Sequence, residues 1–418
     1  MRYIRPPAAS PASLRTWLSA RLEKSWHAES PWPPLRPLSA LFGLAARLRR
    51  RLYEPIFKSF EADKPVVGLP ARLRQGLRTP ILKSFRADKP VVSLGNLTVG
   101  GAGKTPLCLT LAAMLLAKGF KPAVLSRGYG RDKNFVSPLS RGCKRDKNSP
   151  LVVSRGAGPL ISALQSGDEP WLMAEALPGL RVVVDDDRAR AAKLALAELG
   201  ADILILDDGF QQLRLQADCR ILLIPSHQPF GNRALLPAGP LREPVSGHRR
   251  ADMLVTTGAA GPSAEAARLA GGRPLFAASY QPRRWRDHQT GASSSPEALS
   301  GRAVFAFCGL ARPENFLSSL EALKVRLAGL EVGADHQRYD RTRLNGLGLN
   351  FLASKAEVMV TTAKDAVKLP RDFPLPVKIL DVDLALDRPE EFLAALLSFL
   401  QPRQNCLKPT IWREAPKP

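Results

Sequence analysis

Cysteine is scarce in this 418-residue chain, and long apolar runs are absent. The five cysteines (Cys108, Cys143, Cys219, Cys308 and Cys406) are odd in number and scattered, and none forms a CxxC pair or a cluster with histidine. A disulfide framework and a structural zinc site are therefore not supported, and we expect a reduced, cytosolic compartment. The sequence has neither an apolar run of about 18 residues nor a secretory signal, so we expect no transmembrane helix.

Acidic residues are also in short supply. Lys and Arg outnumber Asp and Glu 61 to 38, giving a formal net charge of +23 and a pI near 10.3. Such a charge predicts a polyanionic partner, which could be nucleic acid, an anionic membrane or a phosphorylated substrate. About half of the excess lies in residues 1–100, with 18 basic and 6 acidic side chains.

The N-terminal segment 1–54 contains a basic amphipathic pattern. Leucine and alanine recur at helical spacing, with arginines on the other faces: Leu41, Leu44, Ala45, Leu48 and Leu52 against Arg47, Arg50 and Arg51. This pattern favours a helix that lies in the interface of an anionic bilayer. A helix packed on the protein's own core fits the same pattern, so both interpretations stay open.

Two local duplications follow. PIFKSFEADKPVV (Pro55–Val67) and PILKSFRADKPVV (Pro80–Val92) match at eleven of thirteen positions, and an SRG string recurs as LSRG from Leu125, LSRG from Leu139 and VSRG from Val153. The spacing of fourteen residues is too short for a solenoid repeat. We expect both duplications to be expanded surface loops, with one copy of each serving a site.

From residue 90 the chain alternates between strand and helix patterns. This predicts an α/β fold with a parallel sheet, organised as a P-loop NTPase-type core over residues 55–280 and a smaller C-terminal α/β domain over 281–402. The polar stretch from Gln281 to Gly301 is interpreted as the separator. Residues 403–418 are expected to form a tail.

The strongest single motif is a glycine-rich loop between a buried strand and a helix. Its residues are Thr98, Gly100, Gly101, Ala102, Gly103, Lys104 and Thr105. Backbone N–H groups in such a loop close on a triphosphate, Lys104 reaches the β and γ oxygens, and the Thr105 hydroxyl can bind Mg²⁺. The usual first glycine is replaced by Thr98. We expect this loop to bind ATP.

A carboxylate for the metal is expected at the end of the strand ADILILDD, where Asp207 and Asp208 stand. The expected nucleotide specificity follows from the absence of a guanine-recognition motif. Guanine recognition usually needs [NT]KxD, and in TTAKD Lys364 lies one place too near Asp365. ATP is therefore favoured over GTP.

The motifs GNLTVGGAGKTP, LSRGYG, GDEP, DDGFQ, FGNRALLPAGPLREP, DHQRY and VTTAKDAVKL, in this order, resemble the tetraacyldisaccharide 4′-kinase family of lipid A biosynthesis. The resemblance covers about residues 22 to 400. It implies phosphorylation by ATP and Mg²⁺ of the 4′-hydroxyl of a tetraacyl glucosamine disaccharide 1-phosphate, giving lipid IVA. It also implies peripheral attachment to the cytoplasmic face of the inner membrane. We expect a monomer that binds no nucleic acid.

The resemblance also implies roles for particular residues. Asp168 of GDEP, paired with His336 of DHQRY, would take the proton from the sugar hydroxyl. Glu243 would join Thr105, Asp207 and Asp208 around Mg²⁺. Four further side chains would line the nucleotide or sugar phosphates: Tyr129, Glu169, Arg188 and Arg242. Tyr129 belongs to the first SRG copy, so we treat Arg141 and Arg155 of the later copies as loop arginines.

One departure concerns Gln212, which stands where the family usually has histidine after DDGFQ. Glutamine can hydrogen-bond but cannot gain a proton, so any positive charge at this point must come from elsewhere, and Arg214 is the candidate. A rival interpretation is a membrane-associated P-loop ATPase of the partitioning or site-selecting type, which normally has lysine where Val99 stands. A nucleic-acid-binding module is the second rival, but no zinc finger or RNA-binding strand pair is present.

Overall fold

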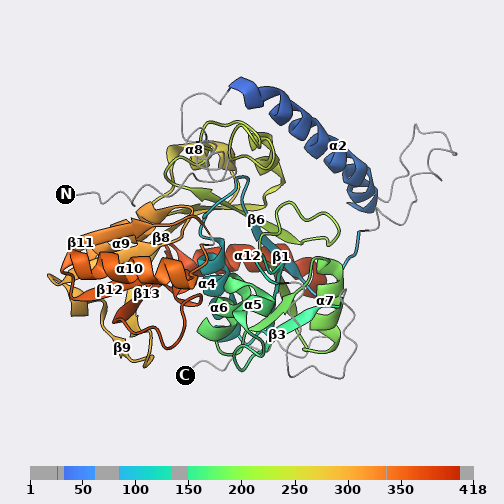
Figure 1. Ribbon diagram of the computed structural model, residues 1–418. Coiled ribbons are helices and arrows are strands. Elements are labelled where there is room, and N and C mark those ends of the chain that lie inside the picture. Colours follow the sequence, from blue (N-terminus) through green and yellow to red (C-terminus); the bar gives the residue numbers. More distant parts are fainter. Residues whose placement is uncertain (1–25, 27–32, 62–83, 133–148, 336, 405–418) are drawn as a thin grey trace.

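One mixed β-sheet runs through the whole molecule (Figure 1). The computed structural model describes residues 26, 33–61, 84–132, 149–335 and 337–404, with side chains left undescribed at 50–61 and 401–404. Within these residues the strands form a 13-stranded sheet in the order β11-β10-β12-β13-β8-β7-β6-β1-β5-β2-β4-β3, and β9 pairs with β8. The P-loop half and the C-terminal half of the chain lie on opposite sides of the view in Figure 1.

The P-loop half is a parallel sheet with one antiparallel edge. Its strands are β1 (Val91–Gly95), β2 (Pro122–Ser126), β3 (Leu151–Arg155), β4 (Arg181–Val184), β5 (Ile203–Leu206), β6 (Cys219–Pro225) and β7 (Met253–Thr257). Its helices are α4 (Lys104–Ala117), α5 (Ala163–Ser166), α6 (Asp168–Ala176), α7 (Arg188–Ala197) and α8 (Ala264–Ala270), with the 3₁₀ turn η4 (Val245–Arg250). Only β3 is antiparallel to its neighbour here.

Helices cover both faces of this half, which explains why its strands read as continuous apolar runs. On one face α4 packs through Leu107, Leu111 and Leu115 into the largest core cluster. On the other face α7 packs through small residues, including Ala191 and Ala195. The expected strand–loop–helix order and the α/β fold are confirmed, with β1 and α4 where the sequence predicts them.

The C-terminal half continues the sheet. Its strands are β9 (Ser293–Ser294), β10 (Ala303–Cys308), β11 (Arg326–Val332), β12 (Val358–Thr362) and β13 (Val377–Leu386), whereas β8 (Leu275–Asp287) pairs with β7 in parallel and is the last strand of the P-loop half. Its helices are α9 (Pro313–Ala322), α10 (Arg341–Ser354), α11 (Ala363–Ala366) and α12 (Pro389–Gln404), with the 3₁₀ turn η5 (Pro296–Leu299). Strands β10, β11, β12 and β13 are parallel to their neighbours within this half.

The two halves join through an antiparallel pair, β8 with β13, in register from Lys378↔Asp287 to Leu386↔Ala278. The interpretation of Gln281–Gly301 as a separator is therefore wrong, because its first seven residues complete β8. Helix α12 then returns to the P-loop half, where Phe392 and Leu396 join the core beside α4. The division at residue 280 stays a prediction about domain organisation, and the sheet itself is continuous across it.

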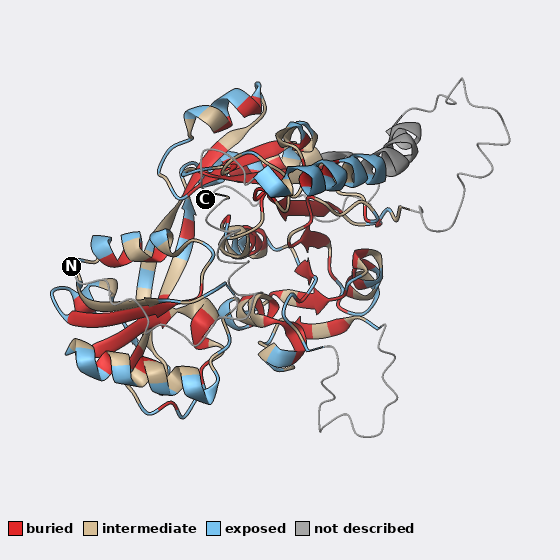
Figure 2. Ribbon diagram, turned by 45° about the horizontal axis from the view of Figure 1, so that its top comes forward, coloured by how far each residue is buried: buried red, intermediate tan, exposed pale blue. Residues whose placement is uncertain are grey.

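Helix α2 (Arg36–Glu61), preceded by the 3₁₀ turn η1 (Pro33–Leu35), lies along one side of the molecule. It is seated on the 234–241 loop: the Ser39 hydroxyl donates to the Leu235 carbonyl at 2.8 Å and accepts from the Ala238 N–H at 3.0 Å. The opposite side of the helix is exposed (Figure 2). No helix in the described ranges is both long and apolar enough to cross a bilayer.

The expectation that both duplications are surface loops is wrong for two of the copies. Pro55–Glu61 of the first repeat continues α2. The third SRG string lies in β3, where Val153 and Ser154 are buried and Arg155 is the last strand residue rather than a loop arginine. The copy at Leu139, with Arg141, lies outside the described residues.

We expect Phe392→Ala to destabilise the P-loop half, although residue 392 belongs to the C-terminal segment. Phe392 is fully buried and its ring meets that of Phe276 edge to face at 5.3 Å, so truncation leaves a cavity costing about 3–5 kcal/mol. The control Leu352→Ala, at a position 67% exposed, should stay within about 0.5 kcal/mol. Equal effects of the two variants in urea unfolding would contradict the placement of α12.

Candidate active site

The loop between β1 and α4 has the backbone of a phosphate cradle. Gly100 and Gly103 have φ of 97° and 77°, a region that residues with a Cβ rarely occupy. Position 103 also has no room for a side chain, because a Cβ there would lie 2.7 Å from the Tyr280 hydroxyl of β8. The loop is braced from β7 by the Thr257 hydroxyl, which donates to the Ala102 carbonyl at 3.0 Å. This geometry leaves the loop N–H groups and the start of α4 available to an anion.

A cavity of about 960 Å³ opens over this loop. Its wall combines the P-loop half, including β8, with residues from β13, α11 and the 310–319 segment of the C-terminal half, and Phe42 and Arg49 of α2 also line it. The antiparallel β8–β13 junction thus closes one side of the cavity. A volume of this size is in the range of small-molecule sites, which are usually about 300–1,000 Å³.

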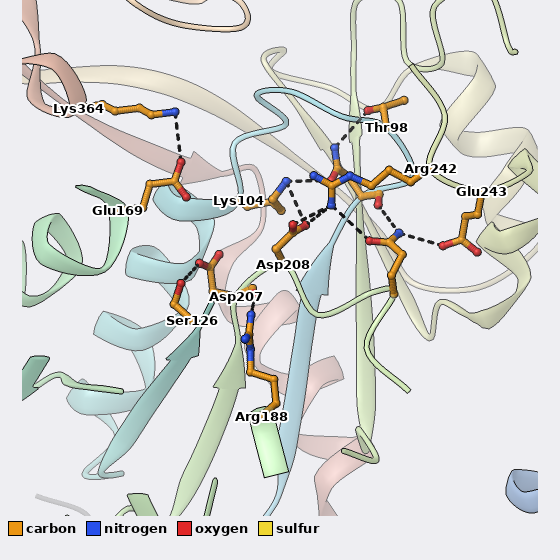
Figure 3. Close-up of polar contacts among 12 residues, drawn as sticks. Thr98, Lys104, Ser126, Glu169, Arg188, Asp207, Asp208, Arg242, Glu243 and Lys364 are labelled. Atoms are coloured by element: carbon orange, nitrogen blue, oxygen red, sulfur yellow. Dashed lines mark hydrogen bonds and ion pairs between the residues drawn. The ribbon is translucent and has the colours of Figure 1, made fainter. Parts of the chain in front are cut away.

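Lys104 stands at the floor of the cavity within a chain of opposite charges (Figure 3). Its Nζ lies 2.9 Å from Asn96 Oδ1 and 3.3 Å from Asp208 Oδ1. Arg242 Nη1 donates to both Asp208 oxygens, at 2.8 and 2.7 Å. Burial raises the pKa of Asp208, but Lys104 and Arg242 outweigh it and lower that pKa to about 2. Asp208 is therefore ionised at every physiological pH.

The pKa of Asp207, the neighbouring carboxyl, is shifted in the opposite direction. It is buried, and burial together with Glu169 and Asp208 raises its pKa to about 6, against a hydrogen bond from Ser126 that lowers it. Ser126 Oγ donates to Asp207 Oδ2 at 2.9 Å, while Oδ1 has no partner among the described residues. Arg188 Nη2 approaches the Asp207 carbonyl at 3.4 Å. A buried carboxylate oxygen without a partner fits a cation or its water shell.

The start of α6 brings two more carboxylates to the site. Glu169 lines the cavity, and its Oε1 lies 3.3 Å from Lys364 Nζ of α11 (Figure 3). Asp168, the first residue of α6, forms an ion pair with Lys368 Nζ at 3.7 Å. Lys364 also donates to Asp335 Oδ1 at 2.9 Å. The C-terminal half therefore holds the acidic end of α6 through lysines.

Comparison with known proteins agrees with this architecture. The family model for tetraacyldisaccharide-1-P 4′-kinase matches residues 68–401. This chain belongs to that family. It is 38% identical to the tetraacyldisaccharide 4′-kinase of Anaeromyxobacter dehalogenans (strain 2CP-C), covering 90% of this chain and 94% of the relative, and 36% identical to that of Syntrophus aciditrophicus (strain SB), covering 74% and 83%. A crystal structure of LpxK from Aquifex aeolicus, described as in complex with ATP, matches with a TM-score of 0.64 and 30% identity over 88% of this chain and 98% of that one.

In this member of the tetraacyldisaccharide 4′-kinase family, most of the predicted site residues share one cavity. Those that line it are Gly100, Gly101, Ala102, Gly103, Lys104, Thr105, Tyr129, Glu169, Arg188, Asp207, Asp208 and Arg242. They come from the loops that follow β1, β2 and β5, from the starts of α6 and α7 and from the loop before η4, and parallel strands present such loops at one edge of a sheet.

Two predicted residues have other partners in this structure. The Thr98 hydroxyl accepts from Asn96 Nδ2 at 3.2 Å, and Thr98 is buried away from the cavity wall, so a phosphate contact by its side chain is not supported. Glu243 is held by Arg250 at 2.8 and 2.9 Å and by Gln211 at 2.9 Å. Its oxygens are already engaged, so this arrangement favours a supporting role over metal ligation.

Of the remaining predicted residues, one lines the cavity and the others do not or lie outside the described residues. Gln212 lines the cavity, but Arg214 pairs with Asp187 at 3.2 Å and does not line it, so Arg214 is not placed to supply the missing histidine charge. Asp168 pairs with Lys368 and does not line the cavity. His336 lies outside the described residues.

Sequence reasoning missed the residues that hold these groups in place. Asn96, Ser126 and Gln211 each contact a charged site residue. All three occur inside the motifs that carry the family resemblance. Position within a motif was the available signal, but no pattern in one sequence says which neighbour a serine or an amide will contact.

We expect Ser126→Ala to shift the pH dependence of Mg²⁺-ATP binding. Removing its hydrogen bond raises the pKa of Asp207 further above about 6, so less of this carboxyl is ionised at pH 7. A hydrogen bond to a charged group contributes about 1.5–3 kcal/mol, so the midpoint should move up by about one to two pH units, with binding recovered at high pH.

Calorimetric titration at a series of pH values measures this shift. Ser154→Ala is the matched control, because Ser154 is a buried serine whose hydroxyl donates to the Leu180 carbonyl at 3.0 Å, away from the cavity. An unchanged midpoint in Ser126→Ala would mean that Asp207 does not control metal-nucleotide binding.

Proposed function

We propose that this protein transfers the γ-phosphoryl group of ATP to the 4′-hydroxyl of a tetraacyl glucosamine disaccharide 1-phosphate, giving lipid IVA. The observation that carries the proposal is the match of residues 68–401 to the tetraacyldisaccharide-1-P 4′-kinase model, in a chain whose phosphate cradle and Glu169 of α6 line one cavity. Phosphoryl transfer mainly requires positioning and charge neutralisation, and this site offers both.

The nucleotide side of the reaction is assigned to the P-loop. The N–H groups from Gly100 to Thr105 hold the phosphates, and Lys104 leaves Asp208 partly or wholly to bind the β and γ oxygens. Arg242 also pairs with Asp208, so this carboxylate stays neutralised when Lys104 moves to the phosphates. Thr105 and Asp207 fit a Mg²⁺ ion, which when bound neutralises the phosphate oxygens, and the unpartnered Asp207 Oδ1 supports this assignment.

The acceptor side is assigned to the start of α6. Asp168, with His336 as its proposed partner, takes the proton from the 4′-hydroxyl as the sugar oxygen bonds to the γ-phosphorus and the bond to the ADP oxygen breaks. The motifs GDEP and DHQRY support these roles. Tyr129, Glu169 and Arg188 line the same cavity and are assigned to the sugar or the phosphates.

The test is incubation of the purified full chain with [γ-³²P]ATP, Mg²⁺ and the disaccharide 1-phosphate in detergent micelles. We expect label in the lipid, and Asp168→Asn should lower turnover by about 10² to 10⁴ while ATP binding persists. Label released only as free phosphate would overturn the kinase and favour the rival ATPase. Full turnover by Asp168→Asn would remove Asp168 from the base role and leave the kinase intact.

We also propose that α2 docks this protein on the anionic cytoplasmic face of the inner membrane. Leu41, Leu44 and Leu48 are 63%, 58% and 58% exposed, on the side of the helix opposite the seat formed by Ser39 and Gly43. Packing on the protein's own core does not account for this apolar ridge within the described residues. A lipid surface accounts for both the ridge and the neighbouring arginines.

We expect the triple variant Leu41→Ser, Leu44→Ser, Leu48→Ser to lose at least about tenfold in partitioning onto anionic vesicles, because the buried apolar area disappears. The matched control changes two equally exposed leucines of α10, Leu349→Ser and Leu352→Ser, which are 69% and 67% exposed. Sedimentation with vesicles measures both. Retained partitioning by the triple variant would assign membrane binding to another surface.

A further inference from the structure

Helix α11 forms part of the cavity wall, yet the proposed reaction gives no role to most of its residues. It follows β12 directly, and Thr362 caps it by accepting a hydrogen bond from the Asp365 N–H at 3.3 Å. It packs against α6, whose first residue is Asp168. The segment that fails as a guanine-recognition motif thus lies beside the proposed base.

Asp365 is the centre of this region. It is fully buried, and its carboxylate accepts from the Gly309 N–H at 3.0 Å, the Thr362 hydroxyl at 2.8 Å and the Tyr339 hydroxyl at 3.2 Å. A buried carboxylate needs such partners, because an unpaired charge away from water is strongly destabilising. These contacts come from the ends of β10 and β12 and from the segment before α10, so Asp365 is fixed from several directions.

Lys368 connects this fixed carboxylate to the proposed base. Its side chain is 10% exposed, and its Nζ lies 3.3 Å from Asp365 Oδ1 and 3.7 Å from Asp168 Oδ2. Lysine normally keeps its ammonium group in water, and here two carboxylates pair with it instead. Lys368, Asp365 and Asp168 all lie outside the cavity wall, where Lys368 joins the two carboxylates.

Lys364, four residues before Lys368, forms an ion pair with the next acidic residue of α6, Glu169. Its Nζ lies 3.3 Å from Glu169 Oε1 and 2.9 Å from Asp335 Oδ1. Burial lowers the pKa of Lys364, but Glu169 and Asp335 outweigh it and raise that pKa, so the lysine stays charged. Two lysines from one segment therefore contact two consecutive acidic residues at the start of α6.

We propose that Lys368, anchored on the buried carboxylate of Asp365, is a positioning residue that holds Asp168 in the orientation needed to accept the sugar proton. The inference rests on the base role proposed for Asp168. An aspartate at the first position of a helix can otherwise turn toward solvent or toward the helix N–H groups. An ion pair from a fixed lysine selects one orientation, and a misplacement of about 1 Å can cost about 10² in rate.

The test compares Lys368→Met, which keeps the length and removes the charge, with Lys368→Arg, which keeps the charge. We expect Lys368→Met to lower kcat by about 10- to 100-fold with the KM for ATP changed less than about twofold. Lys368→Arg should recover most of the lost kcat. In an Asp168→Asn background, Lys368→Met should add less than about twofold, because the orientation of a residue that cannot act as base no longer matters.

Lys378→Met is the matched control. Lys378 pairs with Asp287 at 3.1 Å across the β8–β13 junction and does not line the cavity, so its loss should leave kcat unchanged. Thermal unfolding and ATP binding are measured for every variant, and Lys368→Gln replaces Lys368→Met if the latter does not fold.

The outcomes separate the inference from the function on which it rests. A strong defect in Asp168→Asn with normal kcat in Lys368→Met overturns the positioning role alone. An equal loss from Lys368→Met in the presence and absence of Asp168, or no recovery by Lys368→Arg, also overturns it. Normal turnover by Asp168→Asn overturns the base role and the inference with it.

Discussion

The antiparallel pairing of β8 with β13 is the constraint on which the site depends. It joins the parallel strands of the P-loop half to those of the C-terminal half in one sheet. On one side of the β8–β13 junction, Tyr280 of β8 packs against Gly103 of the phosphate loop. On the other, β12 leads into α11, and Lys364 of this helix and Lys368 just after it reach the start of α6. A triphosphate cradle and an acidic helix end thus face one cavity because the sheet is continuous.

The surroundings of two adjacent carboxyls shift their pKa values in opposite directions. Asp208 lies between Lys104 and Arg242, which hold its pKa near 2 despite burial, whereas burial raises the pKa of Asp207 to about 6. The first is a permanent anion that pairs with Lys104 and Arg242. The second carries an unpartnered oxygen and suits a metal that arrives with the nucleotide. The same residue type therefore serves two purposes through its surroundings.

Sequence reasoning predicted the features that local patterns encode. The P-loop, its strand and helix, and the acidic end of β5 follow from glycine placement and apolar runs. It failed where tertiary pairing overrides local pattern. The half-exposed segment around Arg284 is read as a polar linker, because an antiparallel strand with alternating exposure carries few apolar residues in a row. Asp365 could not be recognised as a buried centre, since its partners at Gly309 and Tyr339 are distant in sequence.

The account's central claim is that the phosphate loop and the start of α6 act on one reacting centre. The most direct test is a crystal structure of the full chain with Mg²⁺, a non-hydrolysable ATP analogue and the disaccharide 1-phosphate. The account predicts that an Asp168 carboxylate oxygen lies about 2.6–3.2 Å from the 4′-hydroxyl oxygen, with that oxygen in line with the γ-phosphorus. A 4′-hydroxyl that contacts a different base, with both Asp168 carboxylate oxygens beyond hydrogen-bond distance of it, would contradict it.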